Sequence, residues 1–153
     1  MSSAGALAIA TPSMERSTRR QWSRVTFLDT TPPWVLESLT ALDKMTELGD
    51  NWDGYGSPRI QPGALISARK LIASVELQDL PAPHACPVSG GHVGLHWRVG
   101  SRELELTVLP DAQIEYLKVL DQDLEREDSM QAGVLAAEHS AELERMLTWL
   151  IRG

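Results

Sequence analysis

Four side chains that could bind a metal ion lie close together in the sequence: His84, Cys86, His92 and His96. Imidazole nitrogens and thiolates are common zinc ligands, at about 2 Å from the ion. Two strand positions separated by four residues lie about 13 Å apart, so His92 and His96 cannot reach one ion unless a bulge intervenes. The spacing also matches no zinc-finger pattern. We therefore expect no metal and no other cofactor, and we assign these histidines to the polar face of a strand.

Cys86 could also act as a nucleophile, with one of the nearby histidines as its base. It stands between Ala85 and Pro87, and no activating motif surrounds it. A thiol in such a place is more often a small apolar group. No set of nucleophile, base and orienting group can be assembled from the chain, so the sequence leans against an enzyme without excluding one.

The most unusual segment is a turn-forming run with two large aromatic side chains, Asn51-Trp52-Asp53-Gly54-Tyr55-Gly56-Ser57-Pro58. The side chains of Asn51 and Asp53 can accept hydrogen bonds from nearby backbone N–H groups. Gly54 and Gly56 allow positive φ, and Pro58 restricts its own φ. These five residues predict a rigid structural loop.

Two ligand-binding motifs resemble this loop but lack essential parts. A calcium loop would need a ligand where Trp52 stands and a glutamate at its end. The glycines lack the remainder of a phosphate-binding or dinucleotide-binding signature. We therefore expect the loop to position two aromatic rings, with Trp52 packed near Trp97 and Tyr55 at the rim.

Five tryptophans are many for a chain of 153 residues that has one phenylalanine. Most are expected in the core, where an indole is a large apolar anchor. Tryptophan, tyrosine and arginine also concentrate at protein interfaces, so any that are exposed would mark a binding surface. The predicted partner-binding residues are Trp22, Arg19, Arg20, Trp52 and Tyr55.

Charge and composition restrict the class of partner. The net charge is −7, which argues against a general nucleic-acid binder, except through the arginines of a flexible basic tail over residues 1–20. Residues 21–153 are expected to form a single domain. One cysteine allows no internal disulfide and fits a reducing cytoplasm. No run approaches the roughly 20 apolar residues that span a bilayer. We therefore expect a cytoplasmic protein without membrane contact, whose partner is another protein.

The hydrophobic pattern predicts the elements that carry these residues. Helical periodicity favours two helices, over residues 31–48 and 62–75, and a last helix over 129–152. Alternation of apolar and polar residues predicts strands over 92–99, 102–109 and 113–120. The expected fold class is α+β, with a three-stranded or four-stranded antiparallel meander packed with two central helices and a C-terminal helix.

The loop over residues 51–58, the helix after it and the later Gly-Leu-His-Trp strand resemble a group of small uncharacterised bacterial and phage proteins. In that group a similar loop precedes a helix, a proline-rich link and a strand that ends in a leucine–glutamate–tryptophan triplet. The likeness covers about residues 35–120. His96 stands where the group usually has an acidic residue, so no catalytic carboxylate is implied there. The resemblance implies the fold and a bacterial origin, and no activity.

These observations predict a non-enzymatic protein-interaction module: an adaptor, an antitoxin or immunity protein, or an accessory subunit of a larger bacterial assembly. It would bind through an aromatic patch and an arginine-rich tail. The alternative is a small hydrolase or ligand-binding domain that uses Asp53, His92 and His96. That alternative requires the three side chains to lie within hydrogen-bond reach of each other, or one water apart.

Overall fold

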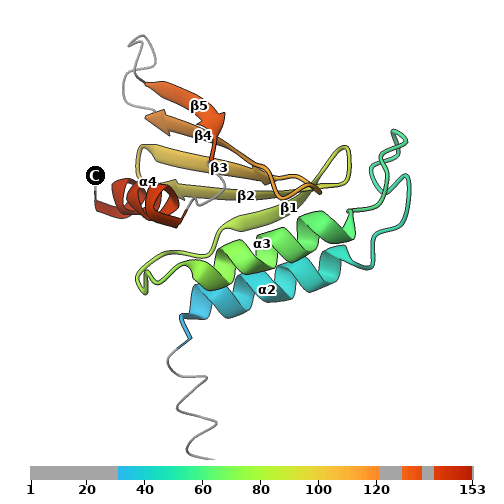
Figure 1. Ribbon diagram of the computed structural model, residues 1–153, viewed down its shortest axis with the longest axis horizontal. Helices are drawn as coiled ribbons and strands as arrows, with labels where there is room; N and C mark the ends of the chain where they lie inside the picture. Colours follow the sequence, from blue (N-terminus) through green and yellow to red (C-terminus); the bar gives the residue numbers. More distant parts are fainter. Residues whose placement is uncertain (1–30, 121–128, 136–139, 153) are drawn as a thin grey trace, which may run out of the picture. The chain divides into compact units, whose positions relative to one another are not determined.

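The computed structural model describes residues 31–120, 129–135 and 140–152. The chain divides into two units, Met1–Pro32 and Pro33–Gly153, and the helices and strands of the described residues all lie in the second. In chain order they are α2 (Pro33–Met45), α3 (Pro62–Ser74), β1 (His84–Val88), β2 (His92–Val99), β3 (Arg102–Val108), β4 (Ile114–Leu120), β5 (Met130–Val134) and α4 (Ser140–Arg152) (Figure 1). The predicted tail over residues 1–20, with Arg19 and Arg20, and the nearby Trp22 lie outside the described residues.

The five strands form one antiparallel sheet in the order β1-β2-β3-β4-β5. Two of its hairpins turn through glycines with positive φ. Gly90 (φ 96°) and Gly91 (φ 85°) join β1 to β2, and Gly100 (φ 60°) begins the turn between β2 and β3. Glycine adopts such angles without the steric cost of a Cβ, and both turns therefore suit tight hairpins.

The α+β class and the antiparallel meander are confirmed, but the predicted sheet of three or four strands with two central helices is wrong in detail. The sheet has five strands, and α4 packs on β2 and β3 as α3 does, so α2 and α3 do not form a central pair. The two missed strands are the edges. β1 lies in a connector rich in proline and glycine, and β5 takes the place of the first part of the predicted helix over residues 129–152.

Neither missed strand has a clear strand pattern in its own sequence, because β1 contains a proline and β5 contains a glycine. In β1, Pro87 pairs with Val93 of β2, and an edge strand tolerates a proline because its missing N–H can face away from the ladder. In β5, Gly133 lies opposite Tyr116. An ideal Cβ at Gly133 would come 2.8 Å from the Tyr116 hydroxyl, so this glycine makes room for the ring.

The helices cover one face of the sheet, and the core lies between them. Alternate residues of β2 and β3 are buried there, whereas His96 is half-buried and Glu105 exposed on the other face, which we call the open face. Trp97, which is 1% exposed, packs edge-on against Trp34, with the ring centroids 6.5 Å apart. Trp52, which was expected beside Trp97, instead lies half-buried at the margin of the core.

Both buried indoles have a hydrogen-bond acceptor. Trp97 Nε1 donates to the carbonyl of Pro81 at 2.9 Å, and Trp34 Nε1 donates to that of Leu77 at the same distance. A buried indole N–H is costly to leave unpaired, so these bonds fix the segment between α3 and β1 against the core. Within the described residues, none of the helices has the length and apolar character needed to cross a membrane.

Candidate functional site

The loop between α2 and α3 is closed by hydrogen bonds that begin and end within it. Asp53 Oδ1 accepts from the backbone N–H groups of Tyr55 (2.9 Å) and Ser57 (3.2 Å), and Asp53 Oδ2 accepts from Ser57 Oγ at 2.5 Å. Asn51 Oδ1 accepts from the N–H of Gly56 at 2.6 Å, and the Asn51 N–H donates to the carbonyl of Ser57 at 2.7 Å. The loop therefore holds one shape through its own side chains.

Three further bonds fasten the loop at its base. Trp52 Nε1 donates to the carbonyl of Pro58 at 3.0 Å, and Ser57 Oγ lies 2.8 Å from Ser89 Oγ in the connection between β1 and β2. The Arg59 N–H donates to Asp50 Oδ1 at 3.0 Å. Together they join the loop to the sheet and to its own flanks.

The two aromatic rings of the loop point to different environments. Trp52 is half-buried and packs against the core, whereas Tyr55 is 93% exposed. Gly54 (φ 77°) and Gly56 (φ 84°) flank Tyr55 with positive φ, which lets the chain turn sharply on both sides of it. The loop thus presents one aromatic side chain to solvent on a rigid support.

The hydrogen bonds of the loop lower the pKa of Asp53. The hydroxyl of Ser57 first, and then the backbone N–H of Tyr55, hold the pKa of the Asp53 carboxyl below its ordinary value, because they bond to the charged form. A carboxyl with a lowered pKa in the folded state stabilises that state above its unfolded pKa. This contribution is lost as the pH falls through the folded pKa.

The first prediction concerns Asp53→Asn, which keeps the shape of the side chain and removes its negative charge. We expect the melting temperature at pH 7 to fall, and the difference from wild type to shrink below about pH 4, near the unfolded pKa, and to vanish below the lowered folded pKa. Thermal unfolding followed by circular dichroism between pH 2.5 and 7 measures both. Asp79→Asn, at an exposed position outside the loop, is the control and should change little. A difference that stayed constant with pH would show that the Asp53 charge does not stabilise the loop.

The histidines predicted for the polar strand face do lie on the open face. His84 and His96 are directly opposite each other in β1 and β2. His96 Nε2 is 3.7 Å from Glu103 Oε2, and Glu103 Oε1 is 2.7 Å from Arg98 Nη1. Within the described ranges no three His, Cys, Asp or Glu side chains are grouped so that they could hold a metal ion.

Asp53, from the alternative hypothesis, and Cys86, the separate candidate nucleophile, each lie in surroundings that do not assemble a catalytic set. Asp53 bonds within its own loop, and among the described residues no hydrogen bond or ion pair joins it to His92 or His96. Cys86 packs over Gly94, where an ideal Cβ would come 3.0 Å from the sulfur. Burial, and then the charge of Glu105, raise the pKa of the Cys86 thiol, which makes the nucleophilic thiolate scarcer.

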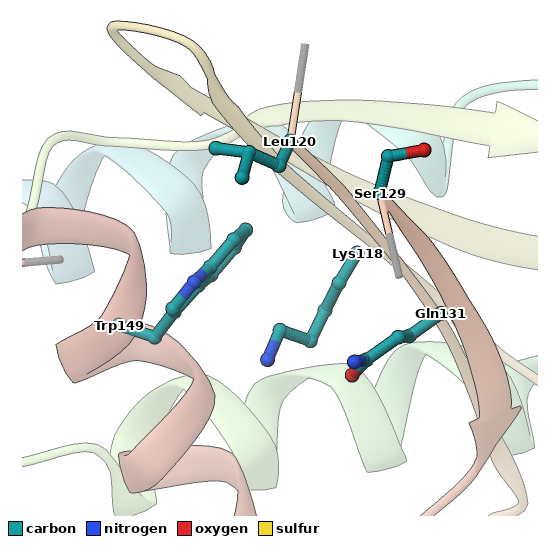
Figure 2. A pocket seen from close by; sticks show the side chains of 5 residues that line it. All are labelled: Lys118, Leu120, Ser129, Gln131 and Trp149. Atoms are coloured by element: carbon teal, nitrogen blue, oxygen red, sulfur yellow. The ribbon is translucent and has the colours of Figure 1, made fainter. Parts of the chain in front are cut away.

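A groove that the sequence did not reveal lies between α4 and the β4–β5 hairpin (Figure 2). It consists of two adjoining hollows that share Lys118 and Gln131. One, of about 190 Å³, is lined by Lys118, Leu120, Ser129, Gln131 and Trp149. The other, of about 300 Å³, is lined by Tyr116, Lys118, Gln131, Glu142, Arg145 and Met146.

Two cations lie against the ring of Trp149 at one end of this groove. Lys118 Nζ is 4.4 Å from the ring centroid and Arg102 Cζ is 5.6 Å from it, both within cation–π range. Desolvation lowers the pKa of Lys118, because partial burial disfavours its charged form. One local signal for this site is Gly133, a poor helix former within the predicted helix over residues 129–152, where β5 forms instead.

Comparison with protein-family models, with curated proteins and with solved structures found no match. The proposal for function therefore stands on the geometry of these surfaces.

Proposed function

We propose that this protein is a non-enzymatic protein-interaction module whose rigid loop presents Tyr55 to another protein. The observation that carries the proposal is the 93% exposure of this ring on a loop held by its own hydrogen bonds. Tyrosine is one of the residues that dominate the energetics of protein interfaces. A loop that is already ordered loses little conformational entropy when it binds, so more of the contact energy appears as affinity.

Trp52 is the other predicted partner-binding residue that the structure describes. Trp52 is partly buried against the core, which leaves part of its side chain exposed for contact. Arg19, Arg20 and Trp22, which lie outside the described residues, are proposed as further partner contacts because their side chains are basic or aromatic. An adaptor, an antitoxin or immunity protein, or an accessory subunit of a bacterial assembly in the cytoplasm would each use such a surface.

The second prediction is that Tyr55→Ala abolishes partner binding without affecting the fold. An almost fully exposed ring contributes little to stability, so we expect the free energy of unfolding to change by less than about 0.5 kcal/mol. Wild type and variant are immobilised in parallel, exposed to lysate of the native host, and the retained proteins are quantified by mass spectrometry. At least one protein should be retained by the wild type and fall at least tenfold with the variant.

Ile66→Ala provides the matched control, since Ile66 is also a large apolar residue, 51% exposed, but lies on α3 outside the loop. It should retain the same proteins as wild type. Equal retention of every protein by wild type and Tyr55→Ala would contradict the proposed role of the loop.

A further inference from the structure

β5 is an end strand of the sheet, and the hydrogen bonds at its two ends show which of its backbone groups face outward. The N–H of Leu135 donates to the carbonyl of Ile114, and the N–H of Leu120 donates to the carbonyl of Ser129. Bonded and non-bonded pairs alternate along an antiparallel ladder. The N–H and C=O groups of residues 130, 132 and 134 therefore point away from β4, toward the edge with which no other described strand pairs.

The open face beside this edge is mostly apolar, with Glu115 opposite Val134 as its charged member. Met130 and Val134 are 55% and 50% exposed. In the next strand, Val119 lies opposite Met130 and Leu117 lies opposite Ala132, and both are only half-buried. Isolated exposed apolar residues are common, but a group that continues to an unpaired strand edge is typical of a binding surface.

The helix-side face beside the same edge is cationic. Lys118 and Arg145 line the groove, and Arg102 lies against the Trp149 ring with a buried Nε that has no hydrogen-bond partner among the described residues. Within the described ranges the side chains in ion pairs are Arg59 with Asp50, Arg69 with Asp43, and His96 and Arg98 with Glu103. The groove cations thus have no carboxylate partner there, and Glu142 is the one acidic side chain among the lining residues given for the groove.

We propose that β5 pairs with an extended segment of a partner protein in which apolar and acidic side chains alternate. A strand added about 4.8 Å beyond β5 would satisfy the outward backbone groups and continue both faces of the sheet. Its apolar side chains would cover Met130 and Val134. Its acidic side chains would point to the helix side, beside Gln131, where the Lys118 ammonium and the Gln131 amide end in the same space (Figure 2).

This inference goes beyond the Tyr55 loop, because the two surfaces share no residue and lie apart: the loop is at the right of Figure 1, and α4 with the β4–β5 hairpin is at the left. The other edge of the sheet is a poorer candidate. β1 contains Pro87, which has no N–H to offer, and α2 packs against this strand. The apolar and cationic faces therefore meet at β5, the edge that carries no proline.

The probe is a fluorescein-labelled peptide of four valine–glutamate repeats, and its binding to the full chain is measured by fluorescence anisotropy. A peptide of four valine–lysine repeats is the comparison. We expect the glutamate peptide to bind at least tenfold more tightly, with an affinity that falls as salt is raised. Ala132→Pro should weaken its binding at least tenfold, because it removes an outward N–H that β4 does not use, whereas Ala132→Val should bind as wild type does.

Charge variants test the contribution of the groove to binding separately from that of the strand edge. Arg145→Glu and Lys118→Met should each weaken binding of the glutamate peptide about fivefold or more, whereas Lys70→Glu, a charge reversal on the exposed side of α3, should not. Circular dichroism shows whether each variant is folded, and Arg145→Glu, at an exposed position, keeps the test valid if Lys118→Met unfolds.

Three results would overturn the inference: no binding of the glutamate peptide, equal binding of both peptides, or no effect of Ala132→Pro. A dimer in analytical ultracentrifugation that Ala132→Pro dissociates would assign the edge to a second copy of the chain and would also overturn it. Tyr55→Ala should bind the glutamate peptide normally, so failure of this inference and failure of the proposed function are distinguishable.

Discussion

Replacing Trp97 with alanine is expected to lower the free energy of unfolding by about 3–5 kcal/mol, because it removes the largest fully buried side chain and leaves a cavity. The ring lies edge-on against Trp34, and such aromatic pairs contribute about 0.5–1.5 kcal/mol beyond the area they bury. The carbonyl of Pro81 also loses its indole donor. For a domain whose total stability is of the order of 5–15 kcal/mol, this loss leaves a substantial unfolded fraction at physiological temperature.

Urea unfolding followed by far-ultraviolet circular dichroism measures the effect. Trp97→Phe is the graded control: it keeps an aromatic ring but loses the N–H, so it should cost less than Trp97→Ala. Trp52→Ala tests the position of the second candidate, since the Trp52 ring is half-buried and donates to Pro58 within its own loop. If Trp52→Ala proved more destabilising than Trp97→Ala, the assignment of the core to Trp34 and Trp97 would be wrong.

Trp52 and Trp97 show which contacts could be predicted from the sequence and which could not. The loop over residues 51–58 could be anticipated because the hydrogen bonds that begin and end within it join residues at most six apart, such as the indole of Trp52 and the carbonyl of Pro58. The choice of Trp34 as the neighbour of Trp97 could not, because those residues lie in separate elements that meet only when α2 packs under the sheet. Hydrogen bonds between residues close in sequence could therefore be predicted, whereas contacts between distant elements could not.

The same distinction explains why β2 and β3 could be predicted from the sequence and β1 and β5 could not. β2 and β3 alternate clearly because one face is buried and the other faces solvent, as the burial of Leu104 and the exposure of Glu105 show. β1 carries Pro87, and β5 has the small residues Ala132 and Gly133, so neither has a strong pattern of its own. Both are specified by pairing with a stronger neighbour, which a single sequence does not display.

The groove was missed for a related reason. Its lining comes from β4, β5 and α4, which are three separate stretches of the chain, and it depends on β5 being a strand. Trp149 falls near the apolar stripe of its helix, and that periodicity alone places it in the core. The packing of α4 on the sheet is what brings the Trp149 ring beside Lys118.

Gly63→Ala is the other substitution with a large expected effect, and here the cause is a collision between two backbones. Gly63 lies in the first turn of α3, where an ideal Cβ would overlap the carbonyl oxygen of Pro110 and lie 3.3 Å from its carbonyl carbon. Pro110 belongs to the turn between β3 and β4, so no side-chain rotation can relieve the contact. Either α3 or the turn must move, and overpacking of this kind typically costs about 1–3 kcal/mol.

Two general effects of glycine-to-alanine substitution act in the opposite direction. Alanine favours a helix interior by up to about 1 kcal/mol over glycine, and it restricts the unfolded chain by about 0.4–1 kcal/mol. Gly49→Ala isolates the effect on the unfolded chain, because an ideal Cβ at Gly49 meets nothing within 4 Å. In urea unfolding Gly49→Ala should be neutral or slightly stabilising and Gly63→Ala clearly destabilising. Equal stability of the two variants would mean that the close approach of α3 to Pro110 can open at little cost, and that this contact does not fix the helix on the sheet.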